Sequence, residues 1–135
     1  MPFENINTIG VLAAVVANMV IGMVWYSPMV FGTHWMTLVG LTEKKMKDNS
    51  PAKAMSICLL LAVVIAIVLS SFLQRTTADT FVEGATQAFW VWLLVACVLV
   101  THGMFQGQRP KLLFITVSHE LVNFLIMGGI LAIVH

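Results

Sequence analysis

The sequence predicts an all-α protein, a four-helix transmembrane bundle with a short interfacial helix between the first and second spans. Its composition points to a membrane, because 59% of the 135 residues are hydrophobic, only 10% are charged and the mean hydropathy is +0.94. Most of the apolar residues fall in four long, nearly uncharged runs. A run of about 18 such residues or more is typical of a helix that crosses the hydrocarbon layer, which is about 30 Å thick.

The four runs predict a single integral membrane domain over residues 1–135. We expect its spans at about residues 7–26, 52–73, 82–105 and 112–134. A cleaved signal peptide is the alternative for the first run. Such a peptide needs a basic start and a small-residue cleavage site, and residues 1–10 contain no Lys or Arg, so a membrane span is the better interpretation.

The first span is expected to end at Trp25 and Tyr26, two amphipathic aromatics typical of the headgroup level, just before Pro28. The segment 31–41 mixes apolar and polar residues over too short a length to cross the bilayer. We therefore expect a short helix lying on the membrane surface, with a mobile polar loop as the alternative.

The later helices have recognisable ends. Ser50 is a suitable N-cap, and Pro51 suits the first helical position of the second span. Thr80 and Glu83 have the spacing of a capping box at the start of the third span. The breakers in residues 107–110 predict a turn before the fourth span. Short connections favour antiparallel neighbours, and hence a bundle.

The placement of basic residues predicts the orientation. Six of the seven Lys and Arg residues lie in the first and third connections, and only Arg75 lies in the second. Because basic loops stay in the cytoplasm, we expect a multi-pass protein of the bacterial inner membrane with both termini periplasmic or extracellular. The net charge of +1, without a basic stripe, argues against a nucleic-acid partner. The expected partner is the lipid bilayer.

Small residues at a spacing of four predict close helix packing on the first two spans. The pattern leaves open whether these two faces meet each other or a second copy of the chain. A homo-oligomer is expected, because four helices are few for a complete pathway. The two stripes are Gly10, Ala14, Asn18 and Gly22 on the first span, and Ala54, Cys58, Ala62, Ala66 and Ser70 on the second.

Glu120 is the most informative polar residue, because it lies about eight positions into the last span. An acid at that depth is costly and usually functional. Helical spacing places His119, Asn123 and Thr116 on or beside the same face. On the first span, Asn18 lies at a comparable depth. With Tyr26 and His102 nearer the cytoplasmic mouth, these residues predict a half-channel that opens to the inside.

Other chemistry fits less well. The polar residues could serve only as interhelical hydrogen bonds, and this structural alternative stays open. We expect no metal and no cofactor, because no further His or carboxylate has metal-ligand spacing and His102 and His119 lie at different depths for a haem. Nucleophile motifs are missing, so a conventional enzyme is not expected. A weaker option is an enzyme that acts on lipid or quinone near Tyr26, His34 and His102.

One motif carries a family resemblance. It reads Gly22-x-x-Trp25-Tyr26-Ser27-Pro28-x-x-Phe31-Gly32-x-x-Trp35, followed by Gly40-Leu41-Thr42. With it the chain resembles, over essentially its whole length, the bacterial integral membrane family catalogued as domain of unknown function 1761. The resemblance implies four membrane helices and no assigned activity.

The sequence therefore supports two hypotheses of different classes. The first is binding or passage of a proton, an ion or a small amphipathic solute, with Glu120 as the titrating group and His119, Asn123 and Asn18 as its polar neighbours. The second is a structural or accessory subunit that packs against a larger membrane complex through the small-residue stripes.

Overall fold

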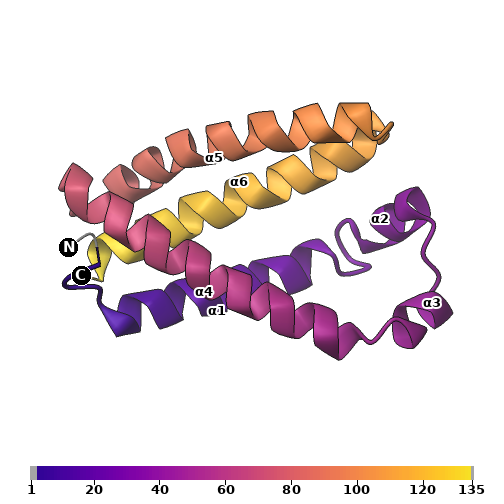
Figure 1. Cartoon of the computed structure of the whole chain (residues 1–135), viewed down its shortest axis with the longest axis horizontal. Helices are drawn as coiled ribbons and strands as arrows, with labels where there is room; N and C mark the ends of the chain where they lie inside the picture. The colour runs from indigo at the N-terminus through magenta and orange to yellow at the C-terminus, as the bar shows by residue number, and fades with distance from the viewer. Residues whose placement is uncertain (1–2, 135) are drawn as a thin grey trace.

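The computed structural model describes residues 3–134, and in this part of the chain it is all-α, without strands. Its four long helices are each long and apolar enough to cross a membrane, as judged by length and composition. They form a bundle, so the predicted fold class is confirmed (Figure 1). The long helices are α1 (Thr8–Trp25), α4 (Pro51–Thr76), α5 (Phe81–Phe105) and α6 (Pro110–Ile133), and the short ones are α2 (Gly32–Val39) and α3 (Glu43–Asp48).

Consecutive long helices run in opposite directions, so the bundle has two distinct ends (Figure 1). The start of α1 and the end of α6 lie together at one end, here called the termini end. The two short helices and the α5–α6 turn lie at the other, here called the α2 end. The central helix is α6, which packs on α1, α4 and α5, whereas α5 packs mainly on α6.

The closest helix approach joins α5 to α6 near the termini end. A Cβ added at Gly84 would overlap the backbone carbonyl of Gly128, and one added at Gly128 would overlap the Ala88 side chain. Small side chains at these positions let the two backbones touch, which is how membrane helices gain packing energy. The sequence stripes on the first two spans did not predict this contact.

The predicted small-residue stripes are packed between helices over only part of their length. Helices α1 and α4 do pack on each other, and Ala14, Ala62 and Ala66 are buried. Ala54 and Cys58, by contrast, are exposed, as is every residue in 51–61. The reason is geometric, because α4 crosses α1 and its first half extends beyond the crossing, away from the bundle (Figure 1).

The connection between α1 and α4 holds two short helices where the sequence predicted one. Helix α2 falls within the predicted segment and ends at Gly40, whose φ of +70° favours glycine. Helix α3 was not predicted, and it begins where the Thr42 hydroxyl accepts the Lys45 N–H. Two contacts hold α2 against the bundle: the Lys111 ammonium donates to Nδ1 of His34 at 3.3 Å, and Trp35 packs edge-on against Tyr26.

The predicted helix starts are partly correct. The capping box of Thr80 and Glu83 is present in full at the start of α5. Pro51 occupies the first turn of α4, as expected. Ser50, however, does not cap this helix with its side chain. Its φ of +52° places it in the left-handed region, whereas an N-cap side chain reaches the helix from an extended backbone.

Candidate functional site

Two titratable residues, the buried His119 and the partly exposed Glu120, are neighbours on α6 where this helix packs on the last turns of α1, and they are here called the buried pair after His119. Nδ1 of His119 lies 3.1 Å from Oε1 of Glu120. The side chains of His119 and Glu120 are 11% and 28% exposed. No Lys or Arg is paired with Glu120 within residues 3–134. The hydrogen-bonded partner of the acid is therefore a histidine.

The second nitrogen of His119 faces Asn123, one turn further along α6. Nε2 of His119 lies 3.4 Å from the Asn123 amide nitrogen, and Asn123 is only 2% exposed. In this orientation the amide donates to an unprotonated Nε2, so the remaining imidazole proton sits on Nδ1 and points at Glu120. The Asn123 carbonyl oxygen is buried and has no hydrogen-bond partner within the described residues.

Turning the Asn123 amide over would exchange its nitrogen and oxygen. The oxygen, unpartnered now, would then accept a proton from Nε2 of a doubly protonated imidazole. The Asn123 amide can therefore donate to Nε2 in one orientation and accept from it in the other. In either orientation one amide atom is left over, and a water or a polar ligand would satisfy it.

Aromatic side chains from α1 and the corner after it cover the pair. Ring centroids of Tyr26 and Trp25 lie 5.0 Å and 6.1 Å from that of His119. The Trp25 indole N–H donates to the buried carbonyl of Ile115 at 3.2 Å. Gly22 lies beside the imidazole, and a Cβ there would make an ordinary contact of 3.7 Å with its Nε2. The aromatic layer covers the His119 ring on the α1 side.

The corner itself is built from tight backbone contacts. Phe31 packs on Trp25 at a centroid distance of 5.1 Å. The Gly32 N–H donates to the carbonyl of Ser27 at 2.8 Å. Any Cβ at Gly32 would overlap the Tyr26 and Ser27 backbone, so only glycine fits here. The corner thereby fixes the direction in which Trp25 and Tyr26 face.

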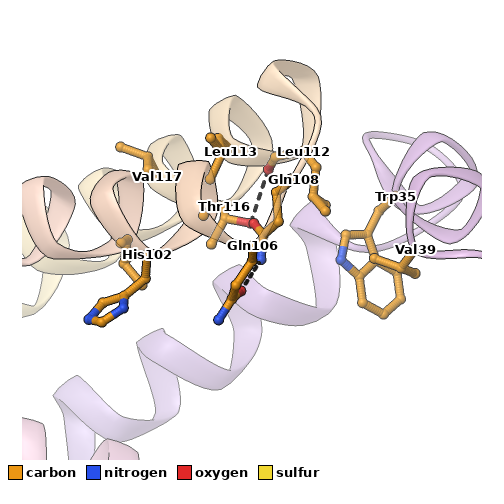
Figure 2. A pocket seen from close by; sticks show the side chains of 11 residues that line it. Trp35, Val39, His102, Gln106, Gln108, Leu112, Leu113, Thr116 and Val117 are labelled. Carbon is orange, nitrogen blue, oxygen red and sulfur yellow. Dashed lines mark hydrogen bonds between the residues drawn. The ribbon is translucent and has the colours of Figure 1, made fainter.

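Thr116 and His102, both predicted site residues, lie nearer the α2 end. They line a cavity of about 350 Å³ between α2, the end of α5 and the start of α6 (Figure 2). Thr116 donates to the carbonyl of Leu112, and the Tyr26 side chain lies near both Thr116 and Glu120. The cavity is thus separated from the buried pair by about one helical turn of α6.

Asn18 does not join the buried pair. Its amide donates across the α1–α6 contact to the sulfur of Met127 at 3.5 Å. Met127 lies eight residues beyond His119, which is about 12 Å along a helix. It is Gly22, one turn nearer the α2 end of α1, that lies level with His119.

The contacts of the aromatic residues with α6 were not predicted from the sequence. Trp25 and Tyr26 were expected at the headgroup level, and Tyr26 also at the mouth of the half-channel; in the structure both are half-buried and face α6. Trp92 of α5 was not recognised either, and its indole N–H donates to the carbonyl of Val117 at 3.0 Å. The one available signal was the dense run of aromatics on both sides of Pro28 and Gly32.

Metal binding finds no support among the side chains: within residues 3–134 no group of three or more His, Cys, Asp or Glu is placed to hold a metal ion. A family model described as a protein of unknown function (DUF1761) matches residues 9–132. The chain is a member of the DUF1761 family. No curated protein and no solved structure matches it.

Membership in the DUF1761 family gives the buried pair a context. The motif that carried the resemblance supplies its cover, since Trp25 and Tyr26 contact His119, Phe31 packs on Trp25, and Trp35 packs on Tyr26. In this DUF1761 protein the most distinctive sequence element and the most unusual buried group therefore form one structural unit.

Proposed function

We propose that this multi-pass membrane protein binds a proton at the His119–Glu120 pair and exchanges it for, or passes it with, an ion or a small amphipathic solute. The observation that carries the proposal is the environment of His119. Both ring nitrogens face polar partners, and the neighbouring Asn123 has the spare oxygen that a second imidazole proton would need. A histidine with a purely structural role would not need an unpartnered oxygen beside its ring.

The route to the pair would begin at the α2 end. The cavity is lined by Trp35 and Thr116, Trp35 packs on Tyr26, and Tyr26 packs on the His119 ring. Beyond the pair, the α1–α6 and α5–α6 contacts are closed by buried Met127 and by Gly128. This supports a half-channel open at one end rather than a continuous pore.

The same arrangement supports an orientation. Six basic residues lie at the α2 end and Arg75 alone at the termini end, so we place the α2 end in the cytoplasm of a bacterium and both termini outside its inner membrane. Those six residues are Lys44, Lys45, Lys47, Lys53, Arg109 and Lys111.

A direct test uses the purified protein in weakly buffered detergent, with tetraphenylphosphonium as a lipophilic cationic probe. Addition of the probe is expected to release protons from the wild type and not from Glu120→Gln. The matched control is Glu83→Gln, which removes a carboxylate but keeps a side chain that can complete the capping box. Proton release that is equal in all three proteins, or absent from the wild type, would rule out solute-coupled proton exchange.

Assembly of copies is part of the proposal, because the first half of α4 offers the small residues Ala54 and Cys58 at an exposed surface. In membranes, mild oxidation should link two copies through Cys58 in a Cys97→Ala background. Cys97, also exposed but on α5, should not link in a Cys58→Ala background.

The accessory-subunit alternative rests on that same exposed half-helix, which a larger partner could cover equally well. Co-purification in mild detergent separates the two. A stable larger partner, assembled normally with Glu120→Gln and without a Cys58 cross-link, would favour the accessory role. We assign no catalytic step to the chain.

A further inference from the structure

A second candidate site is the cavity at the α2 end, which Glu120 does not line (Figure 2). Its volume of about 350 Å³ is within the range of ligand pockets. One part of its lining is aliphatic, with Leu99, Leu112 and Val117 among others, and another part is polar. A ligand here would need an apolar body as well as a head group that forms hydrogen bonds.

The polar part of the lining consists mainly of donors that are not engaged. Gln106 accepts the Gln108 amide through its oxygen at 3.0 Å, which leaves its own amide nitrogen for a ligand. Within residues 3–134 neither the His102 imidazole nor the Trp35 indole N–H has a hydrogen-bond partner. Figure 2 shows Gln106 between His102 and Trp35. The unengaged donors are therefore spread along the lining of the cavity.

Charge narrows the ligand class further. The residues that line the cavity include no Asp, Glu, Lys or Arg. Lys111 of α6 keeps its charge when it donates to His34, but it does not line the cavity. An ionised head group would be desolvated here without a countercharge, which is costly. The head group should therefore be uncharged.

We propose that this cavity binds the head group of a quinone, a flat, uncharged amphiphile with carbonyl oxygens on opposite edges of its ring. Of the two carbonyls, one would accept a hydrogen bond from His102 and the other from Trp35 or Gln106. The aliphatic residues would contact the ring and the first part of its apolar tail. The proposal concerns binding only. The cavity is the one at which the proposed proton route begins, but Glu120 does not line it, so quinone binding does not require Glu120.

The test uses isotope-labelled protein in phosphatidylcholine nanodiscs, titrated with a benzoquinone that carries one isoprenyl unit. The indole N–H signal of Trp35 and the side-chain amide signals of Gln106 should shift and reach saturation. Trp90, which is 57% exposed on α5 and does not line this cavity, reports on quinone dissolved in the lipid, so its signal should change without saturating.

Variants then assign the binding. His102→Leu and Gln106→Leu should each weaken it roughly fivefold to tenfold, because a ligand carbonyl loses its donor. Both residues are exposed, so the helix packing does not depend on them, and unchanged Trp25 and Trp92 signals would verify the fold. Gln87→Leu, elsewhere on α5, is the matched control and should bind like the wild type. Glu120→Gln should also bind normally, which separates this site from the proton site.

Three results would overturn the proposal. The first is a Trp35 signal that follows Trp90 without saturation. The second is unchanged affinity in both His102→Leu and Gln106→Leu. The third is a saturating shift with dioctanoylglycerol, a neutral lipid of similar polarity, when the quinone gives none, since this would assign the cavity to a neutral glycerolipid.

Discussion

At the buried pair, the orientation of one amide depends on the position of one proton. Asn123 donates to Nε2 of His119 when the imidazole is neutral, and it would accept from that nitrogen when the imidazole is charged. Because Asn123 is almost fully buried, bulk water cannot replace its amide as the hydrogen-bond partner of Nε2, whether the imidazole is neutral or charged. A second proton on Nε2 would therefore require only a flip of the Asn123 amide.

A residue-scale prediction concerns Trp25. Trp25→Phe keeps an aromatic ring against Phe31 but removes the indole hydrogen bond to the Ile115 carbonyl. We expect a loss of about 1 kcal/mol in the free energy of unfolding, measured by reversible denaturation in mixed micelles. Trp90→Phe, at an exposed position, should change it by much less. Equal losses in the two variants would show that the hydrogen bond from Trp25 to the Ile115 carbonyl does not contribute to stability.

The candidate site was only partly predictable from single residues. Helical spacing alone places His119 and Asn123 on one face of α6, and Glu120 lies next to them in sequence. The cover by Trp25 and Tyr26 depends on how α1 is shifted along α6, which no periodicity within one helix reveals. The same unknown shift explains why Asn18, although at a comparable nominal depth, meets Met127 instead.

At the scale of helices, the α5–α6 contact holds the most closely packed part of the bundle. Its glycines touch backbone to backbone, and the Ala88 and Ala132 side chains fill the space beside them. Such a contact forms only when small residues on two helices lie at the same height in the bundle. The sequence of either helix alone therefore predicts the contact only weakly. The stripes on α1 and α4 were visible because each extends over several turns.

An element-scale prediction follows for these glycines. Gly84→Ala and Gly128→Ala should each force α5 and α6 apart and lower the free energy of unfolding by about 1–3 kcal/mol. Gly22→Ala is the matched control in a helix, because its added Cβ would make only an ordinary contact with His119. Thermal denaturation in detergent measures all three. Wild-type stability in Gly84→Ala and Gly128→Ala would contradict this packing.

The long helices were well predicted because the bilayer dictates their length, and each begins and ends within three residues of the expected bounds. The short helices were harder, since neither hydrocarbon thickness nor a long apolar face defines them. Helix α3 still had a local signal in Thr42 followed by Glu43, an N-cap and an acid in the first turn.

At the scale of the whole molecule, the two ends of the bundle differ in charge, and this predicts a labelling pattern. In a Cys58→Ala, Cys97→Ala background, a membrane-impermeant maleimide should label Glu4→Cys in intact cells. Lys45→Cys should react only after the cells are permeabilised. Both positions are exposed in the structure, so access depends on the side of the membrane. Labelling of Lys45→Cys in intact cells would reverse the proposed orientation.

The central claim is that Glu120 gains and loses a proton inside the bundle. Infrared difference spectroscopy between acidic and neutral buffer measures this directly, since a protonated carboxyl has its own C=O stretching band. We expect the wild-type difference spectrum to contain a carboxyl band that is missing from Glu120→Gln and retained in Glu83→Gln. Identical difference spectra for the wild type and Glu120→Gln would show that Glu120 does not exchange a proton and would contradict the account.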